Sequence, residues 1–110
     1  MSIKADETNS DELLELGISL CRRARWRDAI DPLQRAVSLD PSKAAAHCQL
    51  GDAYNQTDQL TNALDAYESA VKIQPDHWRA HKGIGVVLDR LGRPGEAAAA
   101  YQRAREVQRR

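Results

Sequence analysis

The chain has 110 residues, enough for one small domain, and its 16 basic and 16 acidic residues give a net charge of zero. No apolar run approaches the roughly 20 residues that a membrane-spanning helix needs. The start lacks the apolar segment of a signal peptide, and the 2 cysteines are too few for a disulfide framework. We therefore expect a cytoplasmic protein with reduced thiols and no membrane contact.

The apolar periodicity predicts six helices after an N-terminal arm. Residues 1–9 show no periodicity and are predicted to be a flexible arm. Ser10 or Asp11 is expected to cap the first helix, because both side chains accept hydrogen bonds from free N–H groups of a first turn. The helix pairs of the domain at 10–110 are expected at 10 to about 24 with 26–39, at 44–57 with 59–73, and at 78–91 with 94–108.

Prolines and one glycine mark helix ends. Pro41 and Pro75 are expected to stop the second helix of the first and second pair, because proline disfavours the α conformation in the residue before it. Gly92 is expected to take a left-handed conformation in the turn of the third pair. Pro32 falls inside a helix, where it removes a backbone hydrogen bond, so we expect a kink or a late helix start there, on the outer side.

A period of 34 residues runs through the chain and divides it into repeats 10–43, 44–77 and 78–110. One glycine recurs in the middle of each first helix, where it costs up to about 1 kcal/mol relative to alanine. The expected compensation is close approach of the paired helix, with a small residue facing each glycine. The glycines are Gly17, Gly51 and Gly85, and the expected facing residues are Ala29, Ala63 and Ala97.

These repeats resemble the tetratricopeptide repeat (TPR) family. The matching residues are Leu13, Leu16, Gly17, Leu20, Ala29, Leu33, Ala36 and Pro41 in the first repeat, His47, Leu50, Gly51, Tyr54, Ala63, Tyr67, Ala70 and Pro75 in the second, and His81, Ile84, Gly85, Leu88, Ala97, Tyr101 and Ala104 in the third. The resemblance implies an all-α fold, a right-handed α-α superhelix of three antiparallel helix-turn-helix hairpins. It also implies that the first helices line a concave groove that binds peptides or partner helices.

The resemblance places thirteen residues in that partner-binding groove: Leu14, Ile18, Cys21, Arg22, Cys48, Gln49, Asp52, Asn55, Arg79, Lys82, Val86, Asp89 and Arg90. Co-chaperone TPR domains hold a C-terminal carboxylate with a clamp of five polar residues. At those places this chain has Leu14, Ile18, Gln49, Arg79 and Gly83, of which only Gln49 and Arg79 suit the chemistry. A clamp of that kind is therefore not expected.

Charge is distributed unevenly, with a net −1 in residues 1–43, −4 in 44–77 and +5 in 78–110. Such asymmetry bears on association. The basic last repeat is expected either to be a solvated surface, or to meet an acidic partner segment or another copy of the chain. The last hairpin also lacks the extra covering helix that is common in the family, so self-assembly as a scaffold through this hairpin is the alternative function.

Other classes of function are disfavoured by the sequence. The arginines around Trp26 adjoin Asp28 and Asp31, and the domain lacks the net positive charge of a nucleic-acid binder. His77 and His81 have a metal-ligand spacing but no third ligand near them in the pattern, so no metal and no cofactor are expected. No catalytic motif is present. The sequence therefore predicts a non-enzymatic protein–protein interaction module with a protein or peptide ligand.

Overall fold

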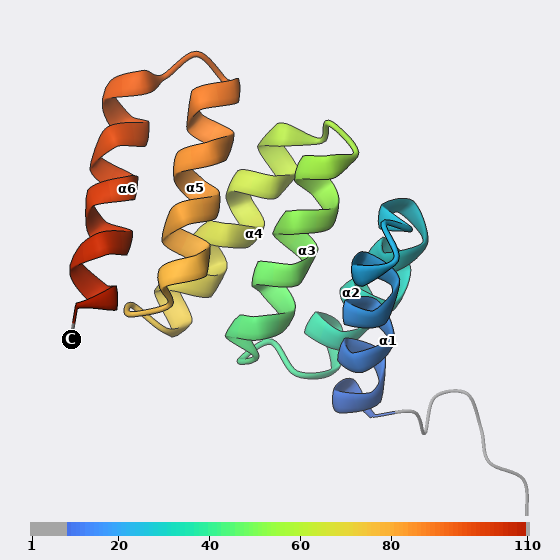
Figure 1. Cartoon of the computed structure of the whole chain (residues 1–110). Coiled ribbons are helices and arrows are strands. Elements are labelled where there is room, and N and C mark those ends of the chain that lie inside the picture. Colours follow the sequence, from blue (N-terminus) through green and yellow to red (C-terminus); the bar gives the residue numbers. More distant parts are fainter. Residues whose placement is uncertain (1–8, 110) are drawn as a thin grey trace, which may run out of the picture.

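The computed structural model describes residues 9–109, and this part of the chain forms six α-helices and no β-strand (Figure 1). The helices are α1 (Ser10–Arg22), α2 (Trp26–Leu39), α3 (Ala44–Gln56), α4 (Leu60–Ile73), α5 (Trp78–Arg90) and α6 (Pro94–Gln108). These bounds lie close to the predicted ones and confirm the all-α prediction. None of the described helices has both the length and the apolar character needed to cross a membrane. Apart from Asn9, the predicted arm lies outside the described residues.

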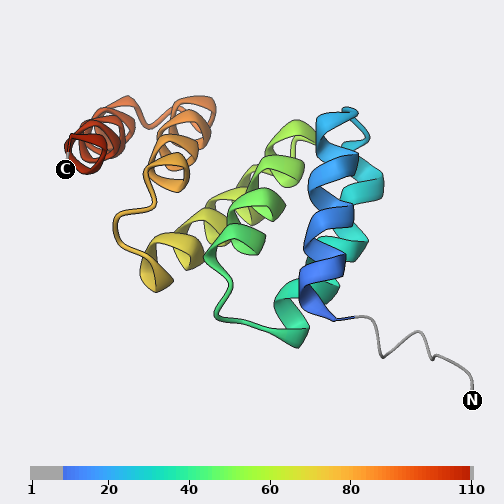
Figure 2. The same ribbon diagram turned by 60° about the horizontal axis from the view of Figure 1, so that its bottom comes forward.

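The helices form three antiparallel pairs that follow one another along the molecule (Figure 2). Within the pairs α1 packs on α2, α3 on α4 and α5 on α6, while α2 packs on α3 and α4 on α5 between the pairs. The first helices also touch, because α1 contacts α3 and α3 contacts α5. One face of the molecule is therefore made by α1, α3 and α5, with α2 and α4 behind them (Figure 1). This arrangement confirms the predicted solenoid of three hairpins.

Each hairpin is closed by a large side chain of its second helix that lies over the glycine of its first helix. An added Cβ at Gly51 would lie 2.7 Å from Cδ1 of the Tyr67 ring, which is closer than real atoms approach. The predicted close approach is thus present, but the facing residue is not the predicted alanine. The three contacts are Leu33 over Gly17, Tyr67 over Gly51 and Tyr101 over Gly85, and each large residue comes one helical turn after the buried Ala29, Ala63 or Ala97.

Tyr67 also joins the second hairpin to the third. Its ring lies against Gly83 of α5 as well as against Gly51 of α3, so a Cβ at either glycine would overlap the ring. The first and second hairpins lack this arrangement. The residue that corresponds to Gly83 is Gln49 in the second hairpin, and the residue that corresponds to Tyr67 is the shorter Leu33 in the first hairpin. The longer aromatic side chain and the additional glycine therefore occur together, as close packing requires.

The first helix begins one residue earlier than the predicted caps allow. The side chain of Asn9 accepts a hydrogen bond of 2.8 Å from the backbone N–H of Glu12, so Asn9 is the N-cap rather than Ser10 or Asp11. Asparagine caps helices as well as serine or aspartate does. The same place in the third hairpin is held by His77, whose Nδ1 accepts from the N–H of Ala80 at 3.2 Å.

Pro32 lies inside α2, which runs from Trp26 to Leu39, so the alternative of a late helix start is wrong and the alternative of a kink stays a prediction. Pro32 is also buried rather than on the outer side, where it was predicted to lie. The missing N–H costs the helix one backbone hydrogen bond. Burial of the ring offsets part of this cost, because it removes apolar surface from water.

The outer face of α6 differs from the faces of α2 and α4 that pack against the next hairpin. In α4, Leu64 and Val71 pack against the cluster that contains Ala80 of α5. The corresponding residues of α6 are Ala98 and Arg105, and both are exposed. This face is thus smaller and more polar than the two internal ones, and self-assembly through it stays a prediction.

The turn inside each hairpin contains one residue in the left-handed conformation. The φ angles are 58° at Ala24, 64° at Asp58 and 76° at Gly92, and the three positions correspond in the repeat. Glycine adopts this conformation without strain, whereas the Cβ of alanine approaches the following carbonyl oxygen at a cost of about 1–2 kcal/mol. The sequence predicted this conformation only at Gly92.

Replacing Ala24 by glycine should therefore stabilise the chain by up to about 1 kcal/mol, because relief of strain exceeds the added freedom of the unfolded chain. Urea unfolding followed by circular dichroism measures the change. The matched control is Ala98→Gly, an exposed site inside α6, which should lose about 1 kcal/mol through lower helix propensity. A loss of stability in both variants would show that Ala24 is not strained.

Candidate functional site

Two adjoining hollows lie on the face made by the first helices. One, of about 380 Å³, is the α1–α3 hollow, and the other, of about 310 Å³, is the α3–α5 hollow; together we call them the groove. Both share Asp52 of α3 and Arg79 of α5. The α1–α3 hollow is further lined by Ile18, Cys21, Arg22, Trp26 and Gln49, and the α3–α5 hollow by Asn55, Gln56, Tyr67, Trp78, Lys82, Gly83 and Val86.

Asp52 is held at the centre of the groove by groups beneath and beside it. The phenol of Tyr67 donates a hydrogen bond to Oδ1 of Asp52, and Nη2 of Arg79 lies 3.6 Å from Oδ2. Desolvation by burial raises the pKa of Asp52, while Tyr67, Arg79 and His77 oppose that rise. Burial and the neighbouring Asp52 carboxylate raise the pKa of Tyr67, so the phenol stays a hydrogen-bond donor. The residue that fills the hairpin core therefore also fixes the acidic side chain of the groove.

The charged side chains that line the two hollows are mostly cationic. They are Arg22, Arg79 and Lys82 on the positive side and Asp52 on the negative side. Within residues 9–109, neither Arg22 nor Lys82 forms an ion pair, and both are exposed. The groove therefore presents an excess of positive charge to water, although the chain as a whole is neutral.

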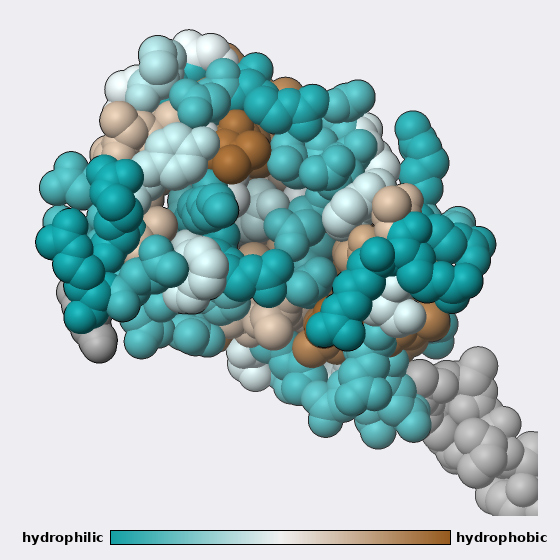
Figure 3. Space-filling model, viewed as in Figure 1, coloured by the Kyte–Doolittle hydropathy of each residue, from teal (hydrophilic) through white to brown (hydrophobic). Residues whose placement is uncertain are grey.

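Apolar surface is limited on the face that carries the first helices. Figure 3 shows this face as largely hydrophilic, with small separate apolar patches rather than one continuous strip. Within the groove, Ile18 and Val86 are half-buried, and Trp78 is 38% exposed despite its size. An aromatic side chain left this open at the edge of a hollow is available for contact with a ligand.

Nine of the thirteen sequence-predicted residues line the groove. They are Ile18, Cys21, Arg22, Gln49, Asp52, Asn55, Arg79, Lys82 and Val86. The thirteen predicted residues did not include five that line the hollows, namely Trp26, Gln56, Tyr67, Trp78 and Gly83. Trp78 had a usable signal, because it stands directly before Arg79 at the start of a first helix. Tyr67 had none, since the repeat pattern assigns that position to the core.

The other four predicted residues do not line the hollows and contact other parts of the protein. Leu14 packs against the core, and Cys48 is a core residue that is 2% exposed and offers a partner almost no surface. Asp89 accepts a hydrogen bond of 3.1 Å from the phenol of Tyr101. Arg90 is held by the preceding hairpin.

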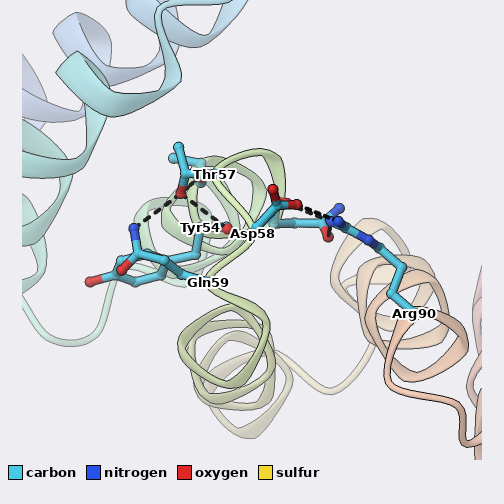
Figure 4. Close-up of polar contacts among 7 residues, drawn as sticks. Tyr54, Thr57, Asp58, Gln59 and Arg90 are labelled. Atoms are coloured by element: carbon cyan, nitrogen blue, oxygen red, sulfur yellow. Dashed lines mark hydrogen bonds and ion pairs between the residues drawn. The ribbon is translucent and has the colours of Figure 1, made fainter.

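Arg90 links α5 to the turn after α3 (Figure 4). Its Nη1 donates to the backbone oxygen of Asn55 at 2.6 Å and to Oδ1 of Asn55 at 2.7 Å, and its Nη2 pairs with Asp58. One of these bonds gives the Oδ1 atom of the buried Asn55 side chain a charged donor. The corresponding positions one hairpin earlier are Cys21, Ala24 and Gln56, which cannot form this set of bonds. Arg90 is therefore a tie between hairpins rather than a free groove cation.

Burial determines the chemistry of both cysteines. It raises the pKa of Cys21 to about 11 and that of Cys48 to about 12, with a smaller contribution from Asp52 in each case. Both are free thiols, and at neutral pH they stay protonated and weakly nucleophilic.

The histidines serve local structure. Nε2 of His47 lies 3.0 Å from the carbonyl oxygen of Pro41, and Nε2 of His81 lies 2.7 Å from that of Pro75, so each ring closes on the turn before its helix. Burial lowers the pKa of His77, in agreement with its role as a neutral cap acceptor. The described part of the chain contains no group of three or more His, Cys, Asp or Glu placed to hold a metal ion.

Two family profiles match the chain. A tetratricopeptide repeat profile matches residues 42–110, and a TPR repeat profile matches residues 19–58. The chain belongs to the tetratricopeptide repeat family. This confirms the resemblance found in the sequence.

Solved structures of other TPR proteins are similar over most of the chain. A crystal structure of MamA is 30% identical with a TM-score of 0.86, covering 93% of this chain and 60% of MamA. A crystal structure of YrrB, described as a TPR protein with an unusual peptide-binding site, is 26% identical with a TM-score of 0.86, covering 92% of this chain and 52% of YrrB. This TPR chain thus spans only part of the length of these proteins. A comparison with curated proteins finds no match.

Family and fold together support a protein–protein interaction module.

Replacing Arg90 by alanine should destabilise this TPR domain by roughly 1–3 kcal/mol, because it leaves Asn55 without its charged donor. Arg105→Ala is the matched control, since Arg105 is exposed and makes no ion pair within residues 9–109. Thermal unfolding of both variants measures the difference. Equal melting temperatures for the two variants would contradict the role of Arg90 as a tie.

Proposed function

We propose that this TPR chain is a non-enzymatic adaptor that holds an extended peptide or a helix of a partner protein in its groove. The observation that carries this proposal is the pair of adjoining hollows on the face of α1, α3 and α5. Their combined lining mixes apolar, amide and charged side chains, which is the composition of a site that positions a ligand through a few polar contacts.

The groove is held in shape by contacts within the protein. Tyr67 fixes Asp52 from below, and Arg90 ties α5 to the end of α3. A groove whose walls are already ordered loses little conformational entropy on binding, so the ordering of the partner dominates that cost. YrrB, a protein of similar fold, is described as having a peptide-binding site, which supports a peptide as the kind of ligand.

The chemistry of the groove favours binding over catalysis. Among the described residues that line it, Cys21 is the thiol, and its pKa of about 11 keeps it protonated at neutral pH. Asp52 is engaged by Tyr67 and Arg79. We therefore propose recognition of a protein segment without its chemical change.

A display library of random twelve-residue peptides, selected on the immobilised chain, tests the proposal. Val86→Gln places a longer, polar side chain in the α3–α5 hollow without adding a charge, and it should weaken the selected peptides about tenfold. Leu39→Gln is the matched control, because Leu39 is 54% exposed on α2, outside the groove, and it should leave binding unchanged. Failure to select any peptide, or equal binding by the two variants, would contradict groove binding.

A further inference from the structure

The charges that line the groove point to the sign of its ligand. Arg22, Arg79 and Lys82 face a single carboxylate, Asp52. That carboxylate already accepts a bond from Tyr67 and faces Arg79, so it attracts a further cation only weakly. A segment with an acidic side chain therefore complements this lining, and a basic segment does not.

Arg79 has the central place among the three cations. It lines both hollows, whereas Arg22 lines only the α1–α3 hollow and Lys82 only the α3–α5 hollow. The Arg79 side chain is 53% exposed, and its one ion pair within the described residues is the 3.6 Å contact with Asp52. A guanidinium has five N–H donors in a planar fork, so one edge of it stays available for the two oxygens of a ligand carboxylate.

An apolar surface lies on each side of Arg79. In the α1–α3 hollow it comes from Ile18 and the half-buried Trp26. In the α3–α5 hollow it comes from Trp78 and Val86, together with the part of Tyr67 that lines the hollow. Each hollow has the room for a side chain rather than for a folded element.

We propose that the groove selects protein segments in which one acidic side chain lies between two apolar or aromatic side chains, with the carboxylate bound by Arg79. The apolar side chains occupy the α1–α3 and α3–α5 hollows. This inference rests on the proposed function, since it assigns the chemistry of the ligand to the same groove. Arg22 and Lys82 add a weaker attraction that salt screens.

The sequences of the peptides selected from the display library give the first test. We expect enrichment of Asp or Glu with an apolar or aromatic residue on both sides. Enrichment of neutral or basic peptides whose binding Val86→Gln still weakens would overturn the acidic ligand while leaving groove binding in place. Selection of no peptide would overturn both.

A double-mutant cycle gives the second test. Each selected peptide is compared with a copy in which Asp or Glu is replaced by Asn or Gln. Fluorescence anisotropy measures the dissociation constant of both peptides for the unmodified chain, for Arg79→Gln and for Lys72→Gln. Lys72 is an exposed cation on α4, outside the groove, and serves as the matched control. Circular dichroism checks that each variant is folded.

We expect the amide peptide to bind the unmodified chain and Lys72→Gln about tenfold more weakly than the acid, and to bind Arg79→Gln about as well as the acid does. Such loss of discrimination in one variant alone places the carboxylate at Arg79. The same discrimination in Arg79→Gln and Lys72→Gln would overturn the assignment.

Discussion

The contact on which this structure depends is that of a large side chain with the glycines of neighbouring helices. Tyr67 is the clearest case, because its ring lies against Gly51 within its own hairpin and against Gly83 of the next. The glycines allow the first helices to approach the ring more closely than any residue with a Cβ would permit. Their cost in helix propensity is offset by the area that the ring buries, since Tyr67 is 2% exposed.

The same residue connects the core to the groove. The ring of Tyr67 is buried between two hairpins, while its hydroxyl reaches the groove and donates to Asp52. Asp52 in turn faces Arg79 on the next first helix. The packing that joins two hairpins therefore also orders the charged centre of the surface that we propose to bind a partner. Each TPR hairpin contacts only its neighbours, so this coupling is local to the second and third hairpins.

Most of the fold could be predicted from the sequence, because its determinants recur in register. The 34-residue period, the prolines after α2 and α4, and the glycine in each first helix specify six helices in three pairs. The left-handed conformation of Ala24 had no local signal, since alanine rarely adopts it. Its only sign was its register with Gly92. The position in the repeat therefore fixes the left-handed conformation of the turn residue, although alanine by itself disfavours it.

The groove was predictable only in part, because the repeat pattern assigns a face and not a contact. Cys48 falls on the predicted face, yet it packs into the core beside Tyr67. Arg90 also falls on that face, but Asn55 and Asp58 engage its guanidinium. Whether a residue on this face is free or engaged depends on the lengths of side chains from different hairpins. The apolar pattern of a single helix carries no information on those lengths.

The double-mutant cycle of Tyr67 and Gly83 measures the central contact most directly. In the unmodified chain, Gly83→Ala should cost about 1–3 kcal/mol of unfolding free energy, because the new methyl group overlaps the ring. In a chain that already carries Tyr67→Leu, the same change should cost nothing or should stabilise, because alanine is the better helix former. An equal cost of Gly83→Ala in both backgrounds would contradict the account.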